Sequence, residues 1–445
     1  MWLVATAGPA FAHGAIGGRK DLPVPLWLFV FGAATALIIS FVALSTLWTE
    51  PRFEDRPLRS ARPSWIQSIL TNHGLEWTIR ILMLLFFVVV AMASARRASV
   101  TETIGPIVVY AWFWVGLAIA HALFGNLWAT LSPFDTIGRL VGPGDEEESP
   151  YRPYPRAWGR WPAAVQLFGF VWVELVEPFG STLGHLGILI VVYTLIQIAG
   201  MQIFGRRAWI ENAEAFAVYF ALIAGMAPLT RDQDGRVVTR PFLSGLARIP
   251  ARPGLVAVIM VALGSTTFDG MSRSSSWITA TAELSGVTRT VVSTAGLLGV
   301  IGLVTLAYVV AMRAAAGVVA SDWHPLAVRF AHSLVPIVLA YVIAHYFSVL
   351  VLEGQLGLVR LSDPFGAGWD LFGTDDWVIN LTLLSPTAIW YVQVAAIVIG
   401  HVGGVVVAHD RAIAMFDRAA AVRTQYALLA VMILFTASGL LILSG

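Results

Sequence analysis

The sequence predicts an all-α fold, a polytopic bundle of transmembrane helices, and three observations predict it. Of 445 residues, 57% are hydrophobic and only 12% are charged. A soluble domain carries about 25% charged residues, because charge is what covers its surface. The apolar residues also gather in long runs, many near the roughly 20 residues that cross a bilayer as a helix. We therefore expect an integral membrane protein whose outer surface faces hydrocarbon.

The apolar runs divide the chain into about eleven expected helices. They lie at 26–48, 77–95, 103–124, 162–178, 181–204, 211–229, 254–269, 288–312, 326–352, 386–408 and 424–443. The runs 162–178 and 254–269 are short, so we expect broken or tilted segments there. The longest gaps, 125–161 and 353–385, are too short and too rich in Pro and Gly to hold a separate core. The sequence thus predicts a single integral membrane domain, 15–445.

The first fourteen residues, "MWLVATAGPAFAHG", resemble the end of a secretory signal peptide with cleavage after Ala12. The alternative is an uncleaved anchor that inserts halfway into the membrane. Cleavage would place His13 at the new N-terminus, outside the cell.

The distribution of arginine predicts the orientation of the second half of the chain. Five arginines lie in 231–254 and three in 410–423, so both segments are expected in the cytoplasm. Counting helices then places 270–287 and 353–385 outside, in a plasma (inner) membrane. An exported N-terminus and a cytoplasmic 231–254 disagree by one crossing. We therefore expect a re-entrant, split or missed segment, around 125–142.

Four histidines mark the expected cytoplasmic ends of two successive apolar runs. His332 and His401 lie about two turns inside their runs, and His324 and His409 lie eight residues away from them at the boundary. In one antiparallel register His332 would meet His401, and His324 would approach His409. Facing imidazoles could ligate a divalent metal or haem iron. The alternative is that these histidines hydrogen-bond to backbone or hydroxyl groups and join helices.

A second polar group is expected at the opposite, exported face. Asp269 closes a short apolar run, His345 lies near the outer end of its run, and Asp363 opens the loop "SDPFGAGWDLFGTDDW". Ionisable groups within a membrane are costly and therefore indicate function. We name Asp269, His345 and Asp363 as candidate catalytic residues of a polar pocket. The alternative is a set of solvated loops, with Asp363 in a turn before Pro.

Three stretches carry a resemblance to a known family. They are "AHGAIGGRKDLPVPLWLFVFGAATALIISFVAL" (12–44), "SDPFGAGWDLFGT" (362–374) and "GHVGGVVVAHDRA" (400–412). With this length and helix number, the chain resembles actinobacterial multi-pass membrane proteins labelled fenitrothion hydrolase. The resemblance implies a multi-pass fold and cleavage of organophosphates, which requires a water activated by a metal or a base. It assigns no catalytic residue.

Three classes of function follow. The first is a metal-dependent hydrolase with its site on the exported face. The second is a membrane redox protein that binds haem or metal through intramembrane histidines. The third is a transporter or assembly factor with a buried proton or ion relay, for which Glu174 and Glu177 are further candidates unless they form a solvated helix end. The net charge of +1 argues against nucleic acid, and the absence of cysteine excludes disulfides and thiolate metal sites. The expected partners are the lipid bilayer and a small-molecule substrate that the sequence does not identify.

Overall fold

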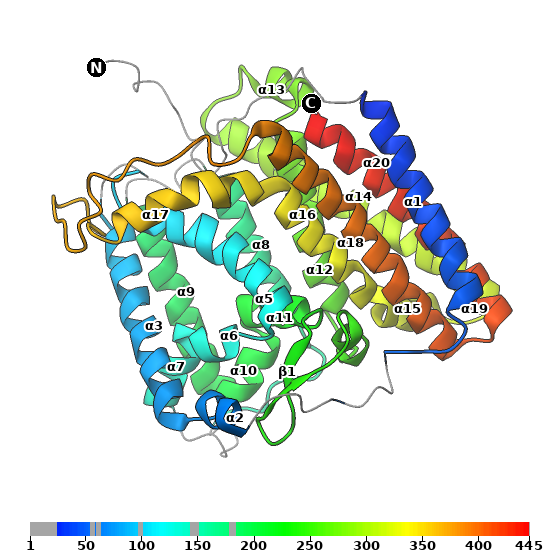
Figure 1. Ribbon diagram of the computed structural model, residues 1–445, viewed down its shortest axis with the longest axis horizontal. Helices are drawn as coiled ribbons and strands as arrows, with labels where there is room; N and C mark the ends of the chain where they lie inside the picture. The colour runs from blue at the N-terminus through cyan, green and yellow to red at the C-terminus, as the bar shows by residue number, and fades with distance from the viewer. Residues whose placement is uncertain are drawn as a thin grey trace.

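The protein is an all-α bundle in which long helices run roughly side by side between two faces (Figure 1). The computed structural model describes residues 25–53, 58, 64–96, 101–142, 151–177 and 184–444. The signal-like segment 1–14 lies outside these residues. The fold confirms the predicted class of an all-α helix bundle.

The long helices are continuous or built from consecutive pieces. The continuous ones are α1 (Leu26–Leu47), α3 (His73–Ser94), α9 (His185–Phe204), α12 (Leu255–Ser272), α14 (Gly286–Val319), α18 (Pro386–Met415) and α20 (Tyr426–Ser444), the last preceded by α19 (Arg418–Thr424). One composite run joins α4 (Gly105–Ile107), η1 (Val108–Leu117) and α5 (Ala118–Phe124). The other joins α15 (Trp323–Phe330), η3 (Ala331–Leu334), α16 (Val335–Ser348), η4 (Val349–Glu353) and α17 (Gly354–Arg360).

Shorter elements connect them. They are α2 (Ser64–Leu70), α6 (Trp128–Leu131), α7 (Pro133–Val141), α8 (Trp161–Leu175), α10 (Arg206–Asn212), α11 (Ala215–Ala224), η2 (Ser244–Arg248) and α13 (Ser275–Thr281), with strands β1 (Leu229–Arg231) and β2 (Val237–Thr239). The strands pair antiparallel, Leu229 opposite Thr239, in a hairpin whose turn has Gly235 at a φ of 76°. Within the described residues, nine helical runs are long and apolar enough to cross a membrane, and α8 and α11 are shorter apolar helices. The chain is therefore a multi-pass membrane protein.

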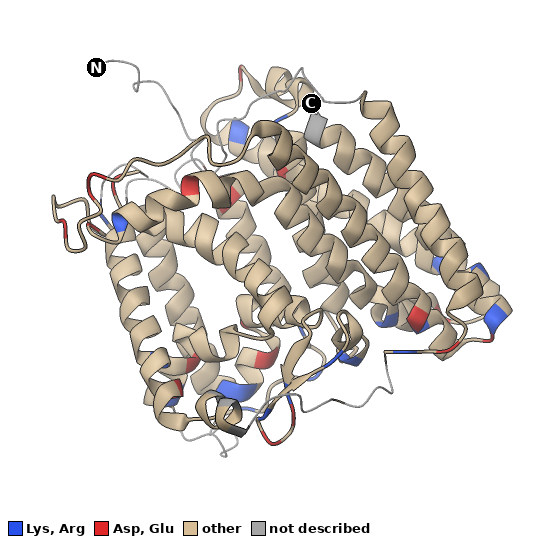
Figure 2. Cartoon of the chain, viewed as in Figure 1, with Lys and Arg blue, Asp and Glu red and all other residues tan. Residues whose placement is uncertain are grey.

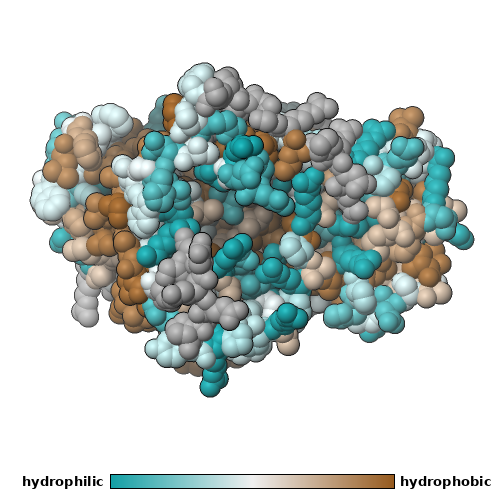
Figure 3. All heavy atoms as spheres, turned by 90° about the horizontal axis from the view of Figure 1, so that it is seen from below, coloured by the Kyte–Doolittle hydropathy of each residue, from teal (hydrophilic) through white to brown (hydrophobic). Residues whose placement is uncertain are grey.

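The two faces of the bundle separate the connecting segments as the arginines predict. The β1–β2 hairpin and the α18–α19 junction lie at one face, hereafter the lower face, and α13 and α17 lie at the opposite, upper face (Figure 1). Basic residues gather mainly along the lower face (Figure 2). Seen from below, hydrophilic side chains surround a central hollow in this face (Figure 3).

Helix α11, within the expected helix 211–229, is much shorter than a membrane crossing. It has 10 residues, which span about 15 Å, half of a hydrocarbon core of roughly 30 Å. Both α10 before it and β1 after it lie in the lower part of the bundle (Figure 1). The run 211–229 therefore begins and ends in the lower part of the bundle. The segment 125–142, where an irregularity was also expected, is split into the short helices α6 and α7, which pack beside α3.

The two runs expected to be short differ in the structure. Helix α8 is short, with 15 residues, as predicted. Helix α12 extends for 18 residues and is long enough to cross, so that expectation was wrong. It begins at the lower face, where the Arg160 amide donates to the Pro253 carbonyl at 2.6 Å, and it carries Asp269 toward the upper face.

Small residues fix the packing of α16 on α18. A Cβ atom at Gly400 would lie 2.2 Å from Ala340 Cβ, and one at Gly404 would lie 2.9 Å from the Ser333 carbonyl oxygen. Small residues at such positions let two membrane helices approach closely. These contacts determine where the histidines of the two helical runs lie along the axis of the bundle.

Candidate functional site

Helices α12 and α16 bring Asp269 and His345 into direct contact. His345 Nε2 lies 2.7 Å from Asp269 Oδ2, and the Asp269 side chain is 1% exposed. Both residues lie in the last third of their helices, toward the upper face. The expectation that these two side chains meet is confirmed in its geometry, while a catalytic role for them stays a prediction.

Two further side chains hold the same carboxylate. The Tyr346 hydroxyl donates to Asp269 Oδ2 at 2.7 Å, and Arg273 Nη2 donates to Oδ1 at 3.1 Å. Arg273 follows Asp269 by four residues, so both lie on one face of α12. Asp269 thus lies among a guanidinium, an imidazole and a phenol.

Glu174, on α8, adds a second carboxylate to this group. It neighbours Tyr346 and lies within electrostatic range of Asp269 and Arg273. Its carboxylate oxygens are shielded from solvent. The interpretation of Glu174 as a solvated helix end was therefore wrong. We call Glu174, Asp269, Arg273, His345 and Tyr346 the acid–base cluster.

The acid–base cluster joins three helices, α8, α12 and α16, inside an apolar bundle. It holds two carboxyl groups against one guanidinium, together with an imidazole and a phenol that can give or accept a proton. Ionisable groups buried in a membrane protein mark proton or substrate paths. Such a set can bind, hold and pass on a proton.

Asp363, the third predicted catalytic residue, does not join this cluster. Its carboxylate accepts N–H bonds from Ala367 at 2.8 Å and Gly368 at 2.7 Å, within its own loop. Burial raises the pKa of this carboxyl, but the surrounding backbone N–H groups outweigh burial and lower the pKa below its usual value. No hydrogen bond or ion pair links Asp363 to Asp269 or His345 in the described part of the chain. Asp363 orders its own loop, in the turn before Pro that the alternative interpretation expects, but it is 4% exposed and so is not solvated as that interpretation also expects.

Two of the four histidines predicted to bind metal have other surroundings. His409 is buried, with Nε2 3.1 Å from the Trp48 carbonyl oxygen and Nδ1 3.3 Å from Gln425 Oε1. His324 is exposed and lies beside the Trp323 ring. Both nitrogens of His409 are therefore occupied by protein groups.

The other two, His332 and His401, are buried at different heights. His401 Nδ1 lies 2.8 Å from the Ile397 carbonyl oxygen, and its ring lies 6.0 Å from that of Tyr341. The residue before His401, Gly400, packs on Ala340, whereas His332 precedes Ser333, which packs on Gly404. The register is thus shifted by about one turn from the predicted pairing. In the described residues no group of three or more His, Asp or Glu could hold a metal, so the four histidines do not form one site.

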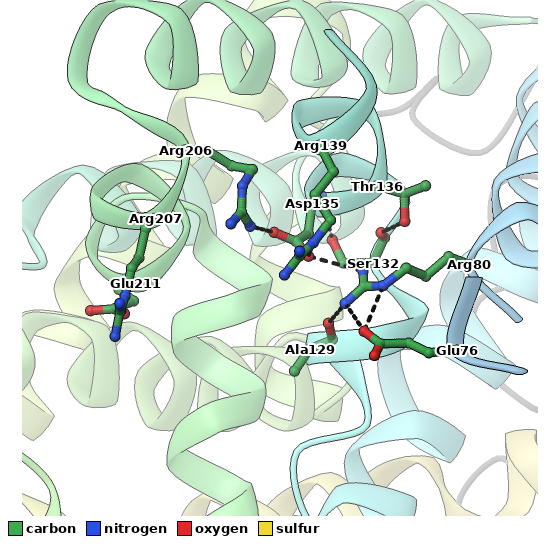
Figure 4. Close-up of polar contacts among 10 residues, drawn as sticks. All are labelled: Glu76, Arg80, Ala129, Ser132, Asp135, Thr136, Arg139, Arg206, Arg207 and Glu211. Carbon is green, nitrogen blue, oxygen red and sulfur yellow. Dashed lines mark hydrogen bonds and ion pairs between the residues drawn. The ribbon is translucent and has the colours of Figure 1, made fainter. Parts of the chain in front are cut away.

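A separate charged network was missed by the sequence interpretation. Arg80, 3% exposed, donates to Asp135 Oδ2 at 2.9 Å, to Glu76 Oε1 at 2.9 Å and to the Ala129 carbonyl at 2.8 Å (Figure 4). Asp135 also pairs with Arg139 at 3.0 Å and with Arg206. Ser132 caps α7 by accepting the Asp135 amide. The network joins α3, α7 and α10 near the lower face, and the "SPFDT" helix start was its only local signal.

The fold and this geometry define an all-α, multi-pass membrane protein with a buried acid–base cluster. No family model, curated protein or solved structure matches the chain. The resemblance to proteins labelled fenitrothion hydrolase therefore stays a prediction.

Proposed function

We propose that the acid–base cluster binds an exchangeable proton and that the protein is a proton-coupled membrane transporter. The observation that carries this proposal is Asp269, a buried carboxylate contacted by His345 and Tyr346 as well as by Arg273. Two of these three partners can exchange protons.

The charges of the cluster support a proton-binding role. Within the acid–base cluster, two ionised carboxylates, Glu174 and Asp269, would face the one guanidinium of Arg273 when His345 is neutral, and Glu353, outside the cluster, lies within electrostatic range of the same guanidinium. The net charge would then be one negative unit, which is expensive to keep inside a membrane. One added proton removes this imbalance, whichever member of the cluster carries it.

The position of the cluster supports coupling of that proton to a conformational change. His345 and Tyr346 on α16 are held to Asp269 on α12, and Glu174 extends from the short helix α8. A change in protonation alters the attraction between three helices at once. A ligand or proton can shift a conformational equilibrium only through such differential contacts.

Infrared difference spectroscopy on the full chain in nanodiscs tests the proposal. A shift from alkaline to acidic pH is expected to give a carbonyl band from a newly protonated buried carboxyl group. Glu174→Gln and Asp269→Asn should each remove or shift this band. Asp363→Asn is the matched control, because its carboxylate is held by backbone N–H groups. An identical band in all four proteins would contradict the proposal.

A hydrolase is the second candidate, and the contact between His345 and Asp269 is the observation that favours it. A carboxylate beside an imidazole, here with Asp269 Oδ2 and His345 Nε2 2.7 Å apart, is part of the arrangement by which a general base activates water. Purified protein would then cleave a phosphotriester, and His345→Gln would abolish cleavage. The exposed His324→Gln is the control and should retain activity. Absence of cleavage by the folded protein excludes this candidate and leaves the proton proposal intact.

We propose further that the lower face is cytoplasmic and that the membrane is the plasma membrane. The arginines of the segments at this face support the orientation. Because the chain has no cysteine, Asp234→Cys and Asp376→Cys each create a single reactive thiol. In intact cells a membrane-impermeant maleimide should label the variant at 376 and leave the variant at 234 unlabelled. The reverse pattern would invert the orientation.

A further inference from the structure

A large apolar cavity lies in the half of the bundle that contains α3, η1, α8 and α9. Its volume is about 630 Å³. Aromatic rings form its inner wall, with Phe113 and Phe216 centroids 4.6 Å apart and Phe170 and Phe216 centroids 5.1 Å apart. No Asp, Glu, Lys or Arg lines it among the described residues.

The cavity reaches the surface at exposed apolar side chains of α8 and α9, two helices that are also joined by a hydrogen bond from Gln197 to Gln166 Oε1 at 2.7 Å. Helix α8 packs on α11 and α12, whereas α9 packs on α3, α7 and α10, so the two helices belong to different sides of the cavity. Val165 on α8 and Val192 and Ile196 on α9 line it and are 66%, 46% and 44% exposed. Outward side chains of membrane-spanning helices contact hydrocarbon. The cavity is therefore continuous with the surface that faces lipid.

The polar side chains in the cavity wall are already used by the protein. Gln166 donates to the Ala213 carbonyl at 2.7 Å, Tyr193 donates to Glu214 at 2.6 Å, and Trp172 donates to Thr294 at 2.9 Å. A ligand would find few free hydrogen-bonding groups there. The lining is suited to hydrocarbon and poorly suited to a polar molecule.

We propose that this cavity holds an acyl chain of a bilayer phospholipid, which enters between α8 and α9. The volume lies within the range of pockets that enclose small molecules, about 300–1,000 Å³. An apolar cavity that stays empty forfeits the dispersion contacts of its lining, and the bilayer supplies a chain at the open side. This proposal is independent of proton binding by the acid–base cluster.

The chain would lie beside the acid–base cluster. Phe170 lines the cavity, and Glu174 lies one turn further along the same face of α8. Tyr110 also lines the cavity and lies within electrostatic range of Glu174. A bound acyl chain thus completes the apolar surroundings of Glu174 on that side and keeps water from reaching it along the cavity.

Gly169 provides the test, because it lines the cavity and a Cβ atom added there meets no atom within 4 Å. Gly169→Leu adds an apolar side chain that occupies cavity space from a position where the Cβ atom itself meets no clash. Gly302→Leu is the matched control, since Gly302 is also an exposed glycine inside a helix, α14, with open space around it. The wild type and both variants are placed in nanodiscs of phosphatidylcholine that carries a photoactivatable diazirine in one acyl chain.

We expect cross-links in the wild type on the cavity-lining residues of η1, α8 and α9. Gly169→Leu should reduce these cross-links several-fold, and Gly302→Leu should leave them unchanged. Val165→Trp, which narrows the mouth at an exposed position, is the second variant and should reduce them too. Equal cross-linking of the lining in all four proteins, or cross-links confined to the outward faces of helices such as α14, would overturn the proposal.

Discussion

Two buried aspartates, Asp135 near the lower face and Asp269 near the upper face, have contrasting partners. Asp135 contacts three guanidinium groups, those of Arg80, Arg139 and Arg206. Asp269 contacts one guanidinium, one imidazole and one phenol. A guanidinium keeps its charge at every accessible pH, whereas an imidazole can exchange a proton and a phenol can pass one on.

This difference separates a structural anchor from a candidate proton site. The Asp135 network holds α3, α7 and α10 together through charges of fixed sign, so its natural role is to fix helix positions. The partners of Asp269 allow the number of bound protons to change. Buried charge alone therefore does not identify function, and the proton chemistry of the neighbours does.

The largest expected effect comes from removing the anchor. Asp135→Ala leaves Arg80, which is 3% exposed, with the carboxylate of Glu76 but without that of Asp135, and the loss of one partner of a buried ion pair costs about 3–5 kcal/mol. We expect a strongly lowered unfolding temperature in detergent, or no folded protein. Thermal unfolding of the purified protein measures this.

Glu211→Ala is the matched control for that substitution. The pair of Arg207 and Glu211 is exposed, at 80% and 47%, and such pairs contribute about 0–1 kcal/mol (Figure 4). The unfolding temperature of this variant should stay close to that of the wild type. Equal effects of the two substitutions would show that the Asp135 network is no anchor.

The contrast between the two aspartates could be predicted only in part from the sequence. The helices follow from hydrophobic length, and Asp269 and His345 were expected together because each lies at the outer end of its apolar run. Arg80 and Asp135 are 55 residues apart, in segments whose contact depends on the tertiary fold. The sequence did not reveal that α11 is only about half as long as a membrane crossing. Hydropathy alone does not separate its 10 helical residues from the apolar residues on either side.

The spacing of the histidines also failed to predict the register of α16 against α18. Matching intervals of eight residues predicted that His332 faces His401. Close approach at Gly400 and Gly404 decides the register instead, because packing against a backbone with no Cβ is what brings the helices together. Steric fit between small residues therefore outweighed the symmetry of the polar pattern.

A smaller effect on stability is expected from Tyr346→Phe, which sharpens the contrast at Asp269. The substitution removes one hydrogen bond to Asp269 Oδ2, worth about 0.5–1.5 kcal/mol. Tyr341→Phe is the control on the same helix, because it removes one bond to the Phe435 carbonyl. Both variants should lose similar stability in thermal unfolding. Only Tyr346→Phe should change the carboxyl band in the infrared titration, and a change in both or in neither would count against a proton role for Tyr346.

The smallest effect is expected at Asp363, a third type of aspartate whose carboxylate accepts hydrogen bonds from backbone N–H groups. Because its folded-state pKa is lowered below the usual value of 3.8, its carboxylate stabilises the loop above that value. This stability is lost as the pH falls through the lowered pKa. Asp363→Asn removes most of it at neutral pH, where the carboxylate of the wild type is ionised.

Amide hydrogen exchange at Ala367 and Gly368 measures this loss, since these two amides donate to the carboxylate. At pH 7, exchange corrected for the intrinsic rate should be faster in Asp363→Asn than in the wild type. The difference should shrink as the pH falls below 3.8 and through the lowered pKa of Asp363, because protonation then removes the same charge from the wild type. A difference that persists unchanged into strong acid would mean that side-chain shape, and not the carboxylate charge, orders the loop. Because Asp363 holds only its own loop, neither outcome should alter the carboxyl band of the acid–base cluster.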